Sequence, residues 1–231
     1  MTFSTPGRPN TTPPLAFSMG EPAGVGPELA LKIYAGAAGT LPTFFAVAPP
    51  DWMAYVAKGL ALPAKAIPIS APEEAEDAFR HGLPVLPPPE SFGTPPTFGK
   101  PDSSNARAVL SSIEESVRLI QAGRASGLVT GPIQKESLLE AGFPHPGHTE
   151  FLAELAGPGQ QSVMMLANSS LRVVPVTVHI PLADVPRRLT SSLLDSTARI
   201  THRALIRDFG LTAPRLWIAG LNPHAGEGGQ M

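Results

Sequence analysis

Apolar residues in this chain form short runs that alternate with segments of helical spacing. Short apolar runs at 15–19, 43–48 and 127–130 predict buried strands. Between 105 and 123 the apolar residues fall three and four positions apart, as in an amphipathic helix. Further helices are expected at 27–34, 51–60, 135–141, 149–155 and 191–209, and further strands at 162–167, 171–178 and 214–221. This alternation predicts a three-layer α/β fold with a mainly parallel sheet.

Proline concentrates between residues 83 and 101, within a chain that holds 28 prolines in total. Proline donates no backbone hydrogen bond and is excluded from helix interiors and from central strands. We therefore expect an extended surface connection in this segment. Residues 1–13 are polar and rich in proline, which predicts a disordered lead-in and not a signal peptide.

Three expected strands run directly into glycine-rich loops. Strand 15–19 leads into GEPAGVGP, strand 127–130 into TGPIQK, and strand 214–221 into NPHAGEGG. In parallel α/β sheets, ligands bind beyond the carboxyl ends of the strands. We therefore expect the active site to be built from these loops.

Composition limits the chemistry and the partners. The formal net charge is -2 and no long run of either sign occurs, so nucleic acid is not an expected partner. No apolar run approaches the roughly 18 residues of a membrane span, so no membrane is expected either. The chain has no cysteine, so a metal site must use histidine, aspartate or glutamate. The same absence fits a cytoplasmic location.

Two histidines follow expected strands. His179 ends the run 171–178, and His224 lies in the loop after 214–221. Imidazoles at adjacent strand ends can share a divalent cation, although a site normally has three or more protein ligands. A hydrogen bond that caps each strand end is the simpler interpretation, and spacing alone favours it.

The segment PGHTEF places His148 and Thr149 at an expected helix start. Free N–H groups there favour an anion, but Thr149 as a plain helix cap explains the pattern equally well. Lys135 can bind a carboxylate or phosphate as a point charge, or can simply be solvated. The loop 20–27 can cradle a phosphate or form a tight turn. Its glycine spacing, G-x-x-x-G-x-G, is not the dinucleotide fingerprint.

Five strings occur in a fixed order between Leu15 and Met231: GEPAGVGPEL, TGPIQK, GHTEF, TVHIPL and GLNPHAGEGG. In this combination the chain resembles the 4-hydroxythreonine-4-phosphate dehydrogenase family. The resemblance implies a fold like that of isocitrate and isopropylmalate dehydrogenases, with two domains around a cleft. We expect a first α/β domain at 14–132 and a second at 133–231.

The resemblance also implies roles for four residues. His148 and Thr149 match the family's substrate-binding pair, and His179 and His224 match two of three metal-binding histidines. The implied cofactors are NAD or NADP and a divalent cation such as zinc, magnesium or cobalt. The implied reaction is oxidation of 4-phosphooxy-L-threonine with decarboxylation to 3-amino-2-oxopropyl phosphate, in pyridoxal 5'-phosphate biosynthesis. The implied assembly is a homodimer whose subunits share the metal site.

The family's third metal-binding histidine and its further substrate contacts lie in a later segment of its sequence. We therefore expect a C-terminally truncated chain that is inactive as a dehydrogenase by itself. Neither a catalytic base nor a nicotinamide-binding residue can be named. Three alternatives remain open: a paralogous dehydrogenase of a phosphorylated sugar acid such as threonate or erythronate, an inactive fragment, and a protein like the phosphate acyltransferases.

Overall fold

The computed structural model describes residues 12–145 without residue 38, residues 147–224, and residues 227–229. The chain divides into two compact units, residues 1–160 and residues 161–231. The boundary expected after residue 132 falls inside the first unit, and the domain division of the whole protein stays a prediction. The disordered lead-in expected at 1–13 lies almost wholly outside the described residues.

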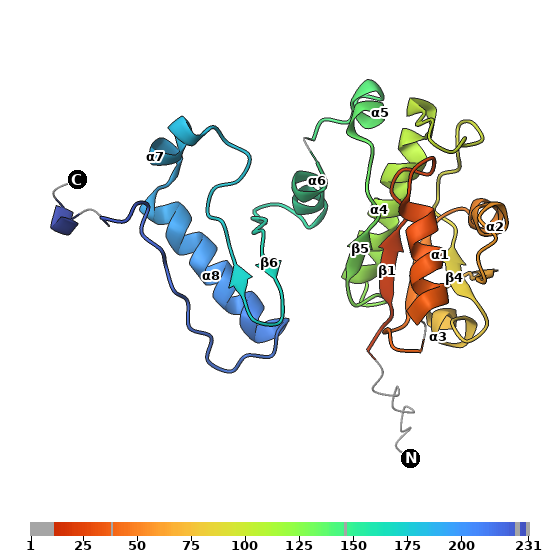
Figure 1. Cartoon of the computed structure of the whole chain (residues 1–231), viewed down its shortest axis with the longest axis horizontal. Coiled ribbons are helices and arrows are strands. Elements are labelled where there is room, and N and C mark those ends of the chain that lie inside the picture. Colours follow the sequence, from red (N-terminus) through yellow and green to blue (C-terminus); the bar gives the residue numbers. More distant parts are fainter. Residues whose placement is uncertain (1–11, 38, 146, 225–226, 230–231) are drawn as a thin grey trace, which may run out of the picture. The chain divides into compact units, whose positions relative to one another are not determined.

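The first unit is built on a parallel sheet with the strand order β3-β4-β2-β1-β5 (Figure 1). Every strand pair in this sheet is parallel. This confirms the predicted α/β fold with a mainly parallel sheet. The strands are β1 Leu15–Ser18, β2 Phe44–Val47, β3 Ala66–Pro68, β4 Leu83–Leu86 and β5 Leu128–Thr130.

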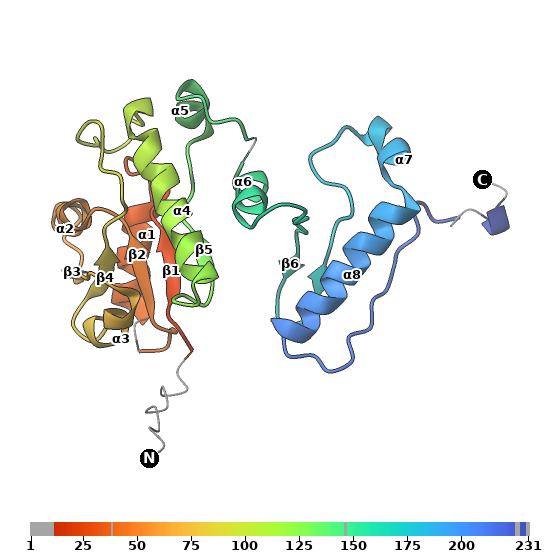
Figure 2. The ribbon, with the colours of Figure 1, turned by 180° about the vertical axis from the view of Figure 1, so that it is seen from behind.

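Helices cover both faces of this sheet, with α1 in front of it in Figure 1 and α4 in front of it in Figure 2. Alternate strand residues belong to two separate apolar clusters, Phe17 to one and Ala16 to the other. Strands buried on both faces are typical of the middle layer of an α/β protein. The helices are α1 Gly26–Ala37, α2 Pro50–Gly59, α3 Ala75–Ala78, α4 Ala106–Gln121, α5 Lys135–Glu140 and α6 His148–Leu155.

Helix α4 contacts the sheet through buried serines as well as through apolar side chains. The hydroxyl of Ser112 accepts a hydrogen bond from the N–H of Met19 at 3.1 Å and donates one to the carbonyl of Val47 at 2.6 Å. Met19 directly follows β1, and Val47 is the last residue of β2. One hydroxyl therefore joins the middle of α4 to the carboxyl ends of two strands.

Strand β4 corrects the expectation for the proline-rich segment, because Leu83–Leu86 is a buried strand inside the sheet. Leu83 donates its N–H to Lys65 on the β3 side, and backbone donors alternate sides along a strand. Pro84 therefore faces β2, but the pairing with β2 begins only at Val85. The missing N–H falls before the first rung of that ladder, where proline is tolerated.

The second unit has one long helix and little sheet. Helix α8, Ser191–Arg207, agrees with the predicted helix, and α7 spans Val185–Arg188. The strands β6 Leu166–Ala167 and β7 Arg172–Val173 form a short antiparallel pair, so the two predicted strands there are mostly wrong. The predicted strand 214–221 is also wrong. No described strand pairs with it, and an unpaired strand leaves its backbone polar groups unsatisfied.

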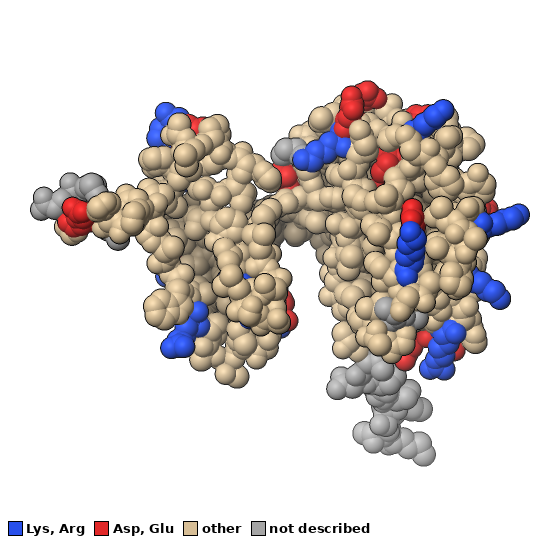
Figure 3. All heavy atoms as spheres, in the orientation of Figure 1, with Lys and Arg blue, Asp and Glu red and all other residues tan. Residues whose placement is uncertain are grey.

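The face of the first unit shown in Figure 3 carries both signs of charge, and its acidic and basic side chains are interspersed. Among the described residues, no helix combines the length and the apolar character needed to span a bilayer. These observations fit the small, mixed charge of the sequence.

The two tryptophans test the fold of each unit separately. Trp52 is 8% exposed and donates from Nε1 to the carbonyl of Pro22, whereas Trp217 is 90% exposed. In Trp52→Phe the remaining Trp217 should give a red-shifted emission that iodide quenches. In Trp217→Phe the remaining Trp52 should give a blue-shifted emission that iodide does not quench. Blue-shifted, protected emission from Trp217 would show that residues 214–221 are buried after all.

Ser112→Ala tests the contact between α4 and the sheet. It removes the acceptor of the buried N–H of Met19, and we expect a loss of about 1–3 kcal/mol in the free energy of unfolding. The matched control is Ser116→Ala, because the Ser116 hydroxyl donates only to the Ser112 carbonyl of its own helix. Urea denaturation measures both variants, and equal losses would contradict the assigned role of Ser112.

Candidate functional site

The loops after β1 and β5 meet backbone to backbone at the carboxyl edge of the sheet. The N–H of Gly131 donates to the carbonyl of Ser18 at 2.8 Å, and the N–H of Glu21 donates to the carbonyl of Pro132 at 2.9 Å. Because β1 and β5 are parallel neighbours, both loops leave the sheet at the same edge. The two motifs GEPAGVGP and TGPIQK therefore form one structure, here called the loop platform (residues 19–26 and 131–134).

Three glycines make this close packing possible. A Cβ on Gly20 would lie 2.4 Å from the carbonyl oxygen of Pro132. A Cβ on Gly26 or on Gly131 would lie 2.0 Å or 2.6 Å from the carbonyl oxygen of Met19. Gly20 also has a φ of +69°, a conformation that favours glycine. No other residue fits these positions without moving the backbone.

The loop 20–27 uses several of its N–H groups internally. Besides the Glu21 bond to Pro132, the N–H of Gly24 donates to the carbonyl of Glu21 at 3.0 Å, and the N–H of Ala23 donates to Oε1 of Glu21 at 3.0 Å. A phosphate cradle needs such groups free to face a ligand. Of the two interpretations left open by the sequence, the structure supports the tight turn.

Glu21 is the functional candidate that the sequence reasoning did not single out. Its side chain is buried at the edge of the sheet, and burial raises the pKa of its carboxyl group above the usual 4.5. The hydrogen bond from Ala23 lowers the pKa, and the negative charge of Asp102 raises it further. The only signal in the sequence was an acidic residue between Gly20 and Pro22, directly beyond a strand.

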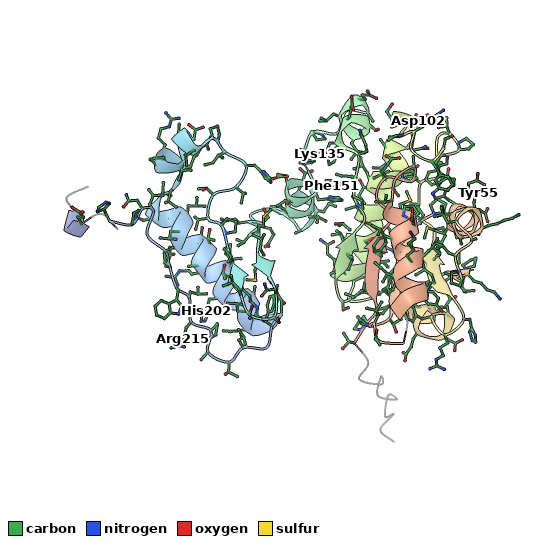
Figure 4. The ribbon with its side chains drawn as sticks, in the orientation of Figure 1. Tyr55, Asp102, Lys135, Phe151, His202 and Arg215 are labelled. Carbon is green, nitrogen blue, oxygen red and sulfur yellow. The ribbon has the colours of Figure 1, made fainter. Side chains whose placement is uncertain are left out.

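Lys135, which Figure 4 labels, is the first residue of α5, and His148 is the first residue of α6. The two lie close enough for the charge of Lys135 to act on the His148 ring. The ammonium nitrogen of Lys135 lies 3.7 Å from the point where a Cβ on Gly147 would stand. His148 is half-buried, and its Nε2 atom is buried without a hydrogen-bond partner among the described residues. Burial lowers the pKa of His148, and the charge of Lys135 lowers it further. Thr149 follows in the first turn of α6 and is half-buried.

His179 and His224 both lie exposed in the second unit, and neither directly follows a described strand. Nδ1 of His224 lies 2.6 Å from Oε1 of Glu227, and the backbone N–H of His224 donates to Oδ1 of Asn222. His179 has a φ of 55°, in the left-handed region. Across the described part of the chain, no three His, Asp or Glu side chains gather as metal ligands. The metal-binding role of this pair stays a prediction.

A hollow of about 390 Å³ lies on the second unit and contains none of the predicted site residues. Its lining residues are Ala198, Arg199, His202 and Arg203 of α8, together with Leu216. Arg199 is already paired with Asp195 on the same helix. The hollow is open to solvent and is lined by none of the residues that the sequence singled out. We therefore place the candidate site at the loop platform.

The fold is that of an α/β protein with a mainly parallel sheet, and the loop platform, our candidate site, lies beyond the carboxyl ends of its strands. Residues 41–231 match the family described as pyridoxal phosphate biosynthetic protein PdxA, which covers most of the chain. The chain belongs to this family. It is 47% identical over 223 residues to a 4-hydroxythreonine-4-phosphate dehydrogenase of Roseobacter denitrificans, and 46% identical over 226 residues to one of Methylorubrum populi.

These matches include most of this chain but only part of each relative. They cover 95% and 94% of this chain, and 65% and 64% of the two relatives. The chain thus spans less than two thirds of the length of these curated relatives.

Solved structures agree with the family. A 4-hydroxythreonine-4-phosphate dehydrogenase from Burkholderia phymatum superposes with a TM-score of 0.83 at 30% identity, covering 96% of this chain and 66% of that one. One from Klebsiella pneumoniae gives a TM-score of 0.80 at 29% identity, covering 94% and 66%. A terephthalate 1,2-cis-dihydrodiol dehydrogenase from Burkholderia xenovorans, at 23% identity and a TM-score of 0.66, shares the fold alone.

Gly20→Ala tests the loop platform. The added Cβ meets the Pro132 carbonyl and the positive φ adds strain, so we expect a loss of at least about 2 kcal/mol in the free energy of unfolding. The control is Gly36→Ala in α1, where a Cβ meets nothing within 4 Å. That change should stabilise the protein by about 0.5–1 kcal/mol. A neutral Gly20→Ala variant would contradict the close packing of the two loops.

Glu21→Gln tests the buried carboxyl group. Because its pKa is raised on folding, the folded state binds the proton more tightly, and stability falls as pH rises from 4.5 through the raised value. Glutamine removes this titration and keeps an acceptor for Ala23. We expect the variant to gain stability over the parent at about pH 7 and to gain little at about pH 4. Exposed Glu76→Gln is the control, and a gain independent of pH would contradict the assignment.

Proposed function

We propose that the protein to which this chain belongs is an NAD(P)-dependent dehydrogenase of 4-phosphooxy-L-threonine. The carbinol carbon of the substrate passes a hydride to NAD or NADP while its hydroxyl group loses a proton. The resulting 3-keto acid then loses carbon dioxide. The products are 3-amino-2-oxopropyl phosphate, carbon dioxide and the reduced nicotinamide, in the cytoplasmic synthesis of pyridoxal 5'-phosphate. The observation that carries this proposal is the 47% identity, across 95% of the chain, to a relative named for this activity.

His148 and Thr149 are the proposed substrate-binding pair. Both stand in the first turn of α6, where backbone N–H groups lack partners within the helix and favour an anionic group. The lowered pKa of His148 keeps its imidazole neutral near neutral pH, so one ring nitrogen donates and the other accepts. Such a ring can orient a substrate hydroxyl or phosphate without adding a charge.

His179 and His224 are the proposed metal ligands, and an imidazole pair suits zinc or cobalt better than magnesium. The contact between Nδ1 of His224 and Glu227 supports this role, because metal-bound histidines are commonly oriented by a carboxylate on the other ring nitrogen. That contact leaves Nε2 of His224 to face a cation. A bound divalent cation would polarise the substrate hydroxyl, and the nicotinamide would accept the hydride.

A homodimer that shares this metal site is part of the same proposal. Its support is the family membership together with the two exposed histidines, which need at least one further ligand. Neither histidine is buried by its own unit, so a neighbouring subunit has access to both.

The direct test is turnover. Residues 1–231 are assayed for NAD(P)H formation with 4-phosphooxy-L-threonine and a divalent cation, alone and joined to the final third of the Roseobacter denitrificans relative. We expect turnover by the joined protein and none by residues 1–231 alone, because two histidines are a weak metal site. Parallel assays with phosphorylated threonate and erythronate separate the proposed enzyme from a paralogue. Preference for a sugar acid would overturn the proposed substrate.

His148→Ala in the joined protein tests the substrate-binding pair. Loss of a hydrogen bond to a charged substrate group should lower kcat/KM by about 10-fold or more. His81→Ala is the matched control, because His81 is exposed and lies in the turn before β4. An unchanged kcat/KM in the His148 variant would remove His148 from the site.

A further inference from the structure

Lys135 is held in place by the loop platform. It is the first residue of α5, and the side chain of Gln134 caps that helix by accepting from the N–H of Ser137 at 2.6 Å. Residues 131 and 132 are bonded to Ser18 and Glu21, so the backbone that leads into α5 is tied to the sheet. Leu138 on the inner side of α5 is buried in the main apolar cluster. The backbone of Lys135 is therefore fixed in position, and its exposed side chain extends toward the start of α6.

The ammonium group of Lys135 lies near the start of α6. Both Cε and Nζ of Lys135 lie 3.7 Å from the position that a Cβ of Gly147 would take. His148 is the next residue, and the pKa of its ring is lowered mainly by burial and further by the charge of Lys135. A cation, an imidazole and the first turn of a helix thus converge on one place.

Two polar groups at this place lack protein partners. Lys135 makes no ion pair with any carboxylate in the described part of the chain, in contrast to Lys32 and several arginines. Nε2 of His148 has no hydrogen-bond partner there either. Glu150 is the acidic group nearest this place, since its Oε2 lies 3.6 Å from the same Cβ position, yet it does not pair with Lys135. The ammonium group of Lys135 and the Nε2 atom of His148 are therefore the two groups at this place whose polar partner a ligand would supply.

We propose that Lys135 binds an oxyanion of the ligand, a phosphate in the first instance, beside His148 and Thr149. This inference rests on the proposed function for the identity of the ligand, and it adds a binding residue to the same site. A phosphate bound there supplies the ion-pair partner that Lys135 does not find in Glu150 or in any other described carboxylate. It pairs with the ammonium group and lies within electrostatic reach of the His148 ring.

The test follows the ring signals of His148 by NMR in the whole chain, with inorganic phosphate as the probe and a His148→Asn variant for assignment. We expect phosphate to raise the pKa of His148, because an added negative charge favours the protonated ring. Lys135→Gln should raise that pKa before any phosphate is added and should weaken phosphate binding about 10-fold or more. Lys135→Arg should retain most of the binding.

Two further variants sharpen the result. Glu150→Gln should strengthen phosphate binding, because it removes the negative charge next to the site. Exposed Lys58→Gln on α2 removes an equal charge elsewhere and should change nothing. If Lys135→Gln and Lys58→Gln bind phosphate equally, or if the pKa of His148 does not respond to Lys135→Gln, the proposal is wrong.

Acetate titrations separate a phosphate site from a general carboxylate site. Tighter binding of phosphate than of acetate supports the proposal, and tighter binding of acetate overturns the assignment to phosphate. None of these measurements needs turnover, so they separate the two proposals. Phosphate binding that depends on Lys135, in a joined protein without dehydrogenase activity, would defeat the proposed reaction and leave the anion site standing.

Discussion

Two backbone hydrogen bonds join the loops after β1 and β5, from Gly131 to Ser18 and from Glu21 to Pro132. A Cβ on Gly20 or on Gly131 would push the two chain segments apart, and a Cβ on Gly26 would clash with Met19 in the same loop. The loop platform that results fixes where α5 begins and so where Lys135 stands. It also buries Glu21, whose carboxyl group is held at the edge of the sheet with a raised pKa. The geometry of the first unit's candidate site follows from this contact.

Local pattern predicted most of the first unit because its elements follow local rules. Strands β1, β2 and β5 are short apolar runs, and α4 has a clear helical spacing. Strand β4 was missed because the number of prolines in a segment does not show whether the backbone N–H that each proline lacks would have been used in the sheet. The side that Pro84 faces depends on the pairing of Leu83 with β3, which no local pattern shows. The role of Ser112 in α4 was unpredictable for the same reason, since its partners Met19 and Val47 lie far away in the sequence.

The second unit departed further from prediction. Residues 214–221 have the apolar content of a buried strand, yet Trp217 and Ile218 are largely exposed. A strand forms only where a neighbour completes its hydrogen bonds, and that neighbour cannot be read from the strand's own sequence. The sequence motifs, in contrast, identified the family and placed His148 at the start of a helix. What they could not predict was that Lys135 lies close enough to His148 for its charge to act on that ring.

Amide hydrogen exchange tests the loop platform most directly. The account predicts that the amides of Glu21 and Gly131 exchange as slowly as those of β1 and β5, because both are bonded inside the platform. A phosphate-cradling loop would instead hold its amides open to solvent until a ligand arrives. Fast exchange at Glu21 and Gly131, comparable with that of the irregular residues 87–91, would contradict the account.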